Sequence, residues 1–477
     1  NKQMFGLDNG MAFILIICII AACFFEFING FHDTANAVAT VIYTNSMKPG
    51  VAVVWSGVFN FIGVYMGGIG VAIGIINLLP MSLLTDQSVN HNIAMILSII
   101  ISSIIWNLGT WYFGIPCSSS HTLLGSLFGV GLAFSLLPGV ENVGLNWTKV
   151  KDAGLSLMLS PLIGFGLTMG IVILVKKISK KLKNNILFEE PQKKKSPPPL
   201  VRGLLVLTCT SVSYSHGSND GQKGVGLLMI ILIALAPLSF SVNHSMQPEK
   251  LLVSLNQIDS IVSKIDYTGL TDIEKGTLTE ANKRLDSMQV ILADINSFDS
   301  LKNGQPQALR KNILISAKLL KNITDPNEDY IHIKLEPAQK KQLNASIADM
   351  KSFTEYAPWW VILLISLSLG IGTMVGWKRI VVTIGEKIGK EHLSYAQGAS
   401  AELVAASTIF FSTSLKLPVS TTHILSSGVA GSMVATNGLK NLRKKTLKNI
   451  LIAWLVTLPV TIILSGGLFL LISYFMG

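Results

Sequence analysis

Two octets of the sequence share one pattern: Gly114-Ile115-Pro116-Cys117-Ser118-Ser119-Ser120-His121 and, 302 residues later, Lys416-Leu417-Pro418-Val419-Ser420-Thr421-Thr422-His423. Both contain an aliphatic residue, Pro, one variable residue, Ser, two residues that are Ser or Thr, and His. Repetition of so specific an octet predicts that the chain is built from two related halves.

Each octet also predicts the start of a helix. Proline ends the preceding helix because it has no N–H group, and a hydroxyl residue after it can cap the next one. Two helix starts entering from opposite sides would direct unpaired N–H groups and positive dipole ends at one point, which suits an oxyanion. The hydroxyls around that point would be those of Ser118, Ser119, Ser120, Ser420, Thr421 and Thr422. The plainer alternative, that each octet only caps its own helix, is less favoured for two related copies.

A weaker pair of motifs lies upstream of the octets: Asn29-Gly30-Phe31-His32-Asp33-Thr34-Ala35-Asn36 and His216-Gly217-Ser218-Asn219-Asp220-Gly221-Gln222-Lys223. Aligned on glycine and aspartate, this pair is 187 residues apart. The two offsets differ by 115 residues, which nearly equals the length of the charged segment 241–357. An insert at 241–357 therefore interrupts the second half.

Composition separates this insert from the rest of the chain. The 477 residues are 49% hydrophobic and only 14% charged, with a mean hydropathy of +0.52, whereas soluble domains are about 25% charged. Residues 241–357 contain 14 of the 38 Lys and Arg residues and 15 of the 27 Asp and Glu residues. We expect a membrane protein with a water-soluble insert. Apolar residues at helical spacing (Leu252, Leu255, Ile258, Val262 and Ile265) predict a small helical bundle there.

Ten apolar segments are candidate membrane spans. They are residues 11–28, 51–79, 93–113, 119–137, 155–175, 204–238 (interrupted), 359–375, 399–411, 421–435 and 450–474. Five crossings in each half give the halves opposite orientations. Inverted repeats of this kind are typical of secondary transporters, which bind substrate near the midplane at broken helices. The predicted fold is therefore an all-α polytopic membrane protein with two inverted repeats, broken helices, re-entrant hairpins and a soluble helical insert.

The predicted domain organisation follows this division. Residues 1–180 form the first membrane repeat, 181–202 a basic cytoplasmic linker, 203–240 the start of the second repeat, 241–357 the insert and 358–477 the remainder of the second repeat. Lys and Arg cluster in the loops 176–202, 378–390 and 440–448, which fall on one side and predict the cytoplasmic face. The insert and both termini then lie outside. The Lys and Arg residues of these loops account for the pI near 9.3, so the basic charge does not indicate binding to nucleic acid.

Asp33 and Asp220 each lie in a Gly- and Asn-rich break within an apolar segment. Carboxylates inside a membrane are costly and usually functional. With Asn36 and Asn219 they offer oxygen ligands for Na⁺, or an acid that can carry H⁺. Lys223 could pair with Asp220 across one helical turn or face the anion directly. Hydrogen phosphate can donate a proton to an aspartate and sulfate at neutral pH cannot, so this site favours phosphate, with arsenate as an analogue.

Other polar residues are predicted to line or support the site. They are Gln222, His121, His423, Asn29 and Glu26, and Glu402 is a weaker candidate. We expect no enzyme and no catalytic residue, because Ser118 or Ser120 beside His121 has no acid to orient a nucleophile–base pair. The four cysteines indicate no disulfide or zinc site. A membrane phosphate sensor, with the insert as its signalling module, is the alternative from another class.

Together the four motifs resemble those of the inorganic phosphate transporter (Pit) family, and most closely the bacterial low-affinity Pit permeases. This resemblance implies phosphate uptake driven by a cation gradient. The serine and threonine hairpins would hold phosphate, and Asp33, Asn36 and Asp220 would serve the coupling cations. The bacterial branch is associated with H⁺ and with neutral metal–phosphate complexes. Mg²⁺ or another divalent cation could thus accompany phosphate and contact Asp33 and Asp220.

The chain departs from the Na⁺-coupled members at Gln222 and Lys223, where those have a hydrophobic or small residue and Asn. Because a lysine ammonium can substitute for a bound cation, the sequence favours an H⁺-coupled phosphate symporter with alternating access. A Na⁺-coupled phosphate or sulfate symporter is the alternative within transport. No cofactor is expected. The expected location is the bacterial inner membrane, and the expected partners are phosphate, the lipid bilayer and, in a homodimer, a second copy of the chain.

Overall fold

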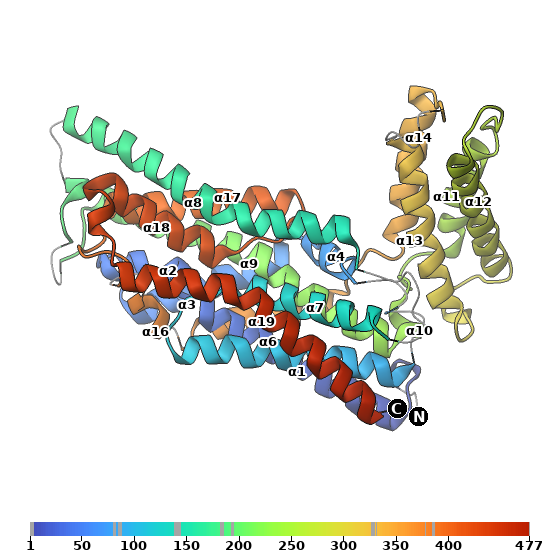
Figure 1. Ribbon diagram of the computed structural model, residues 1–477, viewed down its shortest axis with the longest axis horizontal. Coiled ribbons are helices and arrows are strands. Elements are labelled where there is room, and N and C mark those ends of the chain that lie inside the picture. Colours follow the sequence, from blue (N-terminus) through green and yellow to red (C-terminus); the bar gives the residue numbers. More distant parts are fainter. Residues whose placement is uncertain are drawn as a thin grey trace. The chain divides into compact units, whose positions relative to one another are not determined.

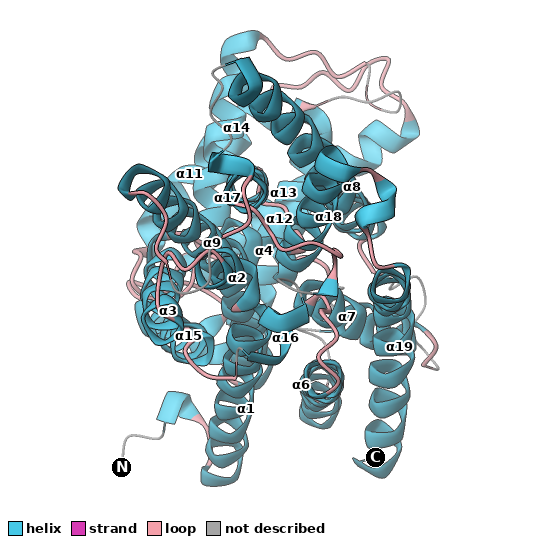
Figure 2. Cartoon of the chain, turned by 90° about the vertical axis from the view of Figure 1, so that its left-hand side faces the viewer, coloured by secondary structure: helices cyan, strands magenta, loops and turns pink. Residues whose placement is uncertain are grey.

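The computed structural model describes residues 4–79, 83, 88–137, 145–181, 186–191, 195–325, 330, 332–376, 378–383 and 387–476. These residues form helices joined by turns and loops, with no strand among them beyond one isolated bridge between Gly389 and Leu442 (Figure 2). The all-helical class predicted from the sequence is thus confirmed. Parts of the predicted cytoplasmic loops, at 182–185, 192–194 and 384–386, lie outside the described residues.

The chain divides into two compact units. The insert unit consists of Asn1–Leu15, Leu84–Gln87 and Ile231–Tyr356, and the membrane unit of Ile16–Leu83, Ser88–Ile230 and Ala357–Gly477. Each unit is described by itself below.

The membrane unit contains the helices of both predicted halves, except for their parts Asn9–Leu15 and Ile231–Leu235, which belong to the insert unit (Figure 1). In the first half they are α1 (Asn9–Asp33), α2 (Ala35–Tyr43), α3 (Pro49–Met66), α4 (Gly70–Ile76), α6 (Val89–Tyr112), α7 (Ser119–Ser135) and α8 (Trp147–Lys181). In the second half they are α9 (Pro199–Leu235), α15 (Trp359–Thr373), α16 (Lys378–Val382), α17 (Tyr395–Ser414), α18 (Thr421–Asn437) and α19 (Lys444–Met476). Five described segments are long and apolar enough to cross a membrane: Asn9–Tyr43, Pro49–Met66, Val89–Tyr112, Trp147–Lys181 and Lys444–Met476.

Every candidate span contains a helix, but two differ from their predicted form. The segment 204–238 was expected to be interrupted near Asp220, and that expectation is wrong because α9 is continuous from Pro199 to Leu235. Its glycines lie against neighbouring helices; a Cβ at Gly217, for example, would clash with the backbone of Asn60. They therefore allow close helix packing rather than a break. The segment 51–79 forms two helices, α3 and α4, separated at Gly68, where φ is +80°.

Helices of the two halves pack on each other in an exchanged pattern. The octet helix of the first half, α7, packs on α19, the last helix of the second half; the second octet helix, α18, packs on α8, the last helix of the first. Glycines permit both contacts: a Cβ at Gly129 would clash with Ser465 and Ile462 of α19, and a Cβ at Gly431 with Phe165 of α8. Small residues let membrane helices approach closely in this way.

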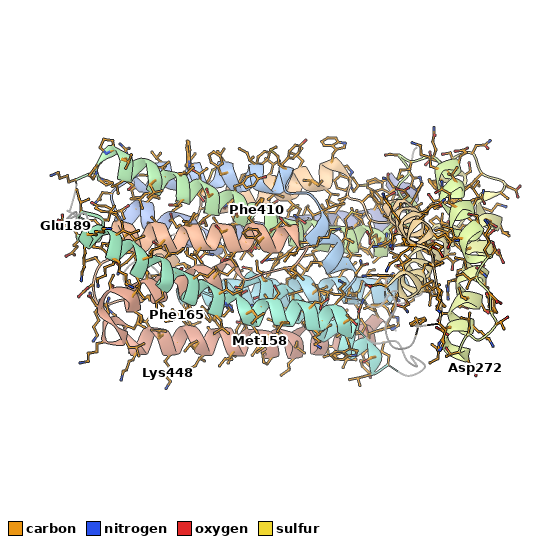
Figure 3. All side chains as sticks on the ribbon, turned by 90° about the horizontal axis from the view of Figure 1, so that it is seen from above. Met158, Phe165, Glu189, Asp272, Phe410 and Lys448 are labelled. Atoms are coloured by element: carbon orange, nitrogen blue, oxygen red, sulfur yellow. The ribbon has the colours of Figure 1, made fainter. Side chains whose placement is uncertain are left out.

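The membrane unit exposes large apolar side chains on its surface and buries polar and charged side chains among the apolar residues of its interior. On α8, Met158 is 73% exposed and Leu162 68% exposed, and on α17 Phe410 is 53% exposed (Figure 3). Buried positions of the same unit include Asp33, Asp220 and Lys223. This distribution fits a protein surrounded by lipid, in which ionisable groups face the interior of the helix bundle.

The insert unit contains a bundle of helices, which Figure 1 shows side by side. They are α11 (Pro248–Val262), α12 (Asp272–Leu292), α13 (Gln305–Thr324) and α14 (Pro337–Ser352), with the short α10 (Pro237–Phe240) before them. Leu255, Ile258 and Val262, which set the predicted helical pattern, lie in its core. Arg310 joins the two ends of the insert, because its Nη1 donates to Ser241 O (3.2 Å) and Thr354 O (2.9 Å). Burial lowers the pKa of Arg310 to about 10, so the guanidinium is charged at neutral pH.

Short 3₁₀ turns complete the described elements: η1 (Met4–Gly6), η2 (Ile186–Phe188), η3 (Phe298–Ser300) and η5 (Leu439–Asn441).

Candidate functional site

The two octets adopt the same backbone turn. Gly114 and Lys416, at equivalent positions, both have left-handed backbones, with φ of +64° and +60°. The next N–H in each turn bonds back to the preceding helix: Ile115 N donates to Thr110 O (3.0 Å) and Leu417 N to Ser412 O (2.9 Å). A non-glycine residue is uncommon in this conformation, so the agreement shows that the turn itself is repeated.

Each turn leads into a capped helix, as the sequence predicted. Ser118 Oγ accepts from His121 N (3.2 Å) at the start of α7, and Ser420 Oγ accepts from His423 N (3.2 Å) at the start of α18. The N–H groups just after a cap have no partner within the helix. Next to them, the hydroxyls of Ser119 and Thr421 are buried and have no hydrogen-bond partner among the described residues.

The two helix starts meet. Ser120 Oγ, in the first octet, donates to Val419 O, in the second, at 2.8 Å. The His121 and His423 rings lie 4.5 Å apart between centroids. The predicted convergence of the two octets on one place is therefore present in the structure.

In the first half, an aspartate and an asparagine contact the octet of the second half. Asp33 Oδ1, at the end of α1, accepts from Thr422 Oγ1 at 2.6 Å. Asn36 Nδ2, in α2, donates to the same hydroxyl at 3.1 Å. All three side chains are buried. The break between α1 and α2 consists of Thr34 alone, whose hydroxyl donates to Gly30 O (2.7 Å).

In the second half, Lys223 makes the corresponding contacts. Its Nζ lies 2.6 Å from Asp220 Oδ1 and donates to Val419 O (2.9 Å) and to Ser120 Oγ. Lys223 is only 3% exposed, and these three acceptors match the three N–H bonds of an ammonium. The pairing of Lys223 with Asp220 across one helical turn is therefore present, and Lys223 also contacts one octet hydroxyl, that of Ser120.

His216 links the two aspartates and was not among the predicted site residues. Its Nε2 lies 3.5 Å from Asp33 Oδ2 and 3.5 Å from Asp220 Oδ2. Its spacing to Asp220, four residues on, places both on one face of a helix. That spacing would have identified His216 if α9 had been predicted as continuous rather than broken.

A chain of hydrogen bonds fixes the orientation of the His216 ring. Thr373 Oγ1 donates to Leu369 O (2.8 Å) and accepts from Asn60 Nδ2 (3.1 Å). The amide oxygen of Asn60 then faces His216 Nδ1 at 2.8 Å, so that Nδ1 is the donor. Consequently Nε2 is the ring atom that faces the two carboxylates.

These groups form a place where a cation can bind. Asp33, His216 and Asp220 each offer one ligand atom, a carboxylate oxygen or a ring nitrogen, and these three atoms lie within 4.8 Å of one another. Asp220 Oδ2 and His216 Nε2 have no hydrogen-bond partner in the described part of the chain. Two carboxylate oxygens and an imidazole nitrogen fit a small cation or a proton at this position. The two aspartates predicted as metal ligands are thus brought together.

Three predicted residues have other partners. Gln222 accepts from Val71 N (2.7 Å) and donates to Gly67 O (2.8 Å), which fixes the turn before α4. Asn219 donates to Leu417 O (3.2 Å) and accepts from Val419 N (3.3 Å), which supports the second octet from behind. Asn29 donates to Glu26 Oε1 at 3.0 Å.

This combination defines the class of the protein. A multi-pass helical membrane protein has two buried half-sites, and in each the residue three positions after an aspartate donates to the octet of the other half. Paired motifs of this kind, buried inside a helical bundle with apolar outer helices, are typical of a secondary transporter.

The chain belongs to the phosphate transporter family (PHO4), whose profile matches residues 29–465. The resemblance stated from the four motifs is thereby confirmed, and the chain is a transporter and not an enzyme.

Several curated relatives extend over almost the entire chain. The low-affinity inorganic phosphate transporter PitA of Escherichia coli (strain K12) is 40% identical, with 99% of each chain covered. PitB of the same organism is 39% identical, with 97% of each covered. The probable low-affinity inorganic phosphate transporter of Bacillus subtilis (strain 168) is 28% identical, covering 97% of this chain and 96% of the relative.

One solved structure, described as the sodium-dependent phosphate transporter, has a similar fold. The TM-score is 0.52 and the sequence identity 20%, with 96% of this chain and 98% of that chain covered. At this identity the similarity concerns the fold alone.

Proposed function

We propose that the chain is a low-affinity phosphate symporter of the bacterial inner membrane, driven by protons and working by alternating access between two inverted repeats. The main support for proton coupling is the ion pair between Lys223 and Asp220, in which Lys223 also contacts Ser120. A lysine fixed at this point supplies the positive charge that a co-transported metal cation would otherwise supply in this half.

Phosphate would bind where the two octets meet. The free hydroxyls of Ser119 and Thr421 and the N–H groups at the two helix starts are uncharged donors, and Lys223 adds one positive charge. Helix N-termini bind phosphate well. Uncharged donors with a single lysine also suit an anion that must be released on the other side, as low affinity requires.

The exchanged packing of α7 on α19 and α18 on α8 supports the inverted-repeat proposal. Each octet is held by a helix of the other half. A rocking motion between halves would therefore change the access to both octets together, which is what alternating access needs.

The half-site of Asp33, Asn36 and Thr422 favours a second candidate, in which Na⁺ is the coupling ion. These three residues offer oxygen ligands, and none of them is a cation. Na⁺ coordinated there would be the coupling ion, with Lys223 neutralising the other half.

Uptake into proteoliposomes separates these candidates. Labelled phosphate is supplied under a pH gradient alone, a Na⁺ gradient alone, or both, with and without Mg²⁺. Accumulation driven by the pH gradient in Na⁺-free medium supports the proton symporter, and accumulation only with Na⁺ supports the second candidate. Binding of phosphate without any flux would contradict both and favour a sensor.

A further inference from the structure

Glu26, in α1, is a buried acid outside the cluster of Asp33, His216 and Asp220. Its side chain is 0% exposed, and its Oε1 accepts from Asn29 Nδ2 at 3.0 Å. Its Oε2 has no hydrogen-bond partner in the described part of the protein. The proposed phosphate site makes no use of this carboxyl group.

The Oε2 atom lies at the contact between α1 and α9. A Cβ added to Gly224 would come within 2.5 Å of Glu26 Oε2 and 3.0 Å of Ile365 in α15. Glu26 thus lies against Gly224, the residue that follows Lys223 in α9. The glycine makes room for the carboxyl group, and Ile365 is an apolar neighbour of the same glycine.

The charged groups near Glu26 are already paired elsewhere. On α9 they are Lys223, Asp220 and His216, and on α1 the neighbouring titratable group is Cys23. The ammonium of Lys223 uses its three N–H bonds on Asp220, Ser120 and Val419, and the His216 ring faces Asp33 and Asp220. No ion pair to Glu26 occurs among the described residues.

We propose that Glu26 is the residue that binds the co-transported proton, an inference that rests on the proposed proton-coupled function. An ionised carboxylate with one unpaired oxygen is costly in a water-free interior, whereas the protonated acid is neutral. Glu26 therefore carries its proton while it is buried away from water, as it is in this structure. It takes that proton from water on one side of the membrane and releases it to water on the other.

Phosphate and this proton are coupled through charge. Phosphate bound at Ser119, Thr421 and the two helix starts brings negative charge close to Lys223, whose own charge acts on Glu26. The added negative charge favours the protonated acid. Linkage is reciprocal, so a proton on Glu26 favours phosphate binding by the same factor. After phosphate leaves, Lys223 and His216 face one anion fewer, and an ionised Glu26 is better tolerated during the return step.

Glu26→Gln tests the inference, because glutamine keeps the shape and stays neutral. The purified full-length protein is reconstituted, and two rates are measured: uptake of labelled phosphate driven by a pH gradient, and exchange of labelled for unlabelled phosphate without a gradient. We expect the ratio of driven uptake to exchange to fall at least tenfold. The protons entering per phosphate, recorded with a pH dye trapped in the vesicles, should fall as well.

Asp152→Asn is the control. Asp152, in α8, is an exposed acid whose Oδ2 lies 3.8 Å from Lys149 Nζ. This variant should keep the wild-type ratio. An unchanged ratio in Glu26→Gln would overturn the inference, as would a fall of equal size in Asp152→Asn.

Glu26→Asp covers the case in which the glutamine variant loses exchange as well. Aspartate retains a titratable group, so both driven uptake and exchange should return. If the aspartate variant also fails while still inserting as a monodisperse protein, Glu26 is structural and the inference is wrong. If the wild-type protein exchanges no phosphate at all, the proposed function is wrong, and the inference, which rests on it, is wrong as well.

Discussion

Asn36 and Lys223 occupy equivalent places in the two halves of the site. Each follows an aspartate by three residues, and each donates a hydrogen bond to the third hydroxyl residue of the opposite octet, Thr422 for Asn36 and Ser120 for Lys223. The halves therefore share a hydrogen-bond pattern and differ by one positive charge. That charge lies 2.6 Å from Asp220.

Lys223→Asn should make the second half resemble the first. Without the ammonium, Asp220 needs a cation from solution, so we expect uptake driven by the pH gradient alone to fall at least tenfold and Na⁺ to stimulate what remains. The measurement is labelled phosphate uptake in Na⁺ medium and in choline medium.

Lys223→Met is the control for this change, since methionine fills a similar space without a donor. It should lose uptake in both media because Asp220 loses its lysine partner and Ser120 loses the donor that Lys223 supplies. Equal uptake by the asparagine variant in the two media would contradict the role of Lys223 as a resident cation.

Asp220→Asn removes the partner of a buried lysine. Breaking a buried ion pair typically costs about 3–5 kcal/mol, so this variant should unfold at a lower temperature and lose phosphate accumulation. Asp33→Asn should also lose accumulation, but with a smaller thermal shift, because Asp33 has no lysine partner among the described residues. Thermal unfolding in detergent and uptake in proteoliposomes measure the two effects. Undiminished accumulation in both variants would refute the coupling role of the aspartates.

Ser119→Ala combined with Thr421→Ala should weaken phosphate binding while sparing the helix caps, which belong to Ser118 and Ser420. A hydrogen bond to a charged group contributes about 1.5–3 kcal/mol, so the double variant should raise the KM for phosphate by about a hundredfold or more. Ser211→Ala is the control, because its exposed hydroxyl only donates to Leu207 O in the same helix. A KM equal to that of the control would place phosphate elsewhere.

The sequence predicted the octet turns, their caps and their convergence because those depend on local residues and on a repeat. It predicted Asp33, Asn36, Asp220 and Lys223 for the same reason. The continuity of α9 escaped it, because a Gly- and Asn-rich stretch has low helix propensity and only packing against Asn60 and Val64 shows why the glycines are there. His216 was not predicted for the same reason, because its position next to Asp220 depends on α9 being continuous. The alternative partners of Gln222 and Asn219 depend on loops folded against them, which no local pattern reveals.

The insert should lose stability in acid through Glu274. Burial acts to raise the pKa of this carboxyl, but the N–H groups of Thr271 and His332, the Thr271 hydroxyl and the nearby His332 ring lower it on balance. A lowered pKa in the folded state contributes stability that is present above the unfolded value, about 4.3, and is lost as the pH falls through the folded value. Hydrogen exchange of α12 in the full-length protein, corrected for the intrinsic rate, should thus show less protection below about pH 4.

Glu274→Gln should show weaker protection at neutral pH and a smaller loss in acid. Glu280→Gln serves as its control, because Glu280 is half-buried and pairs with Arg284, one turn away on α12. A wild-type acid response in the Glu274 variant would show that other carboxyl groups cause the effect.

The exchanged packing of the octet helices also sets the order in which the protein can mature. Translation produces α7 early, yet the surface of α7 that contains Gly125 and Gly129 is covered by Thr461 and Ser465 of α19, which is made much later. Until α19 has been made, that surface is open to lipid or to another protein in the membrane. A nascent chain that stalls before α19 therefore presents an exposed glycine face.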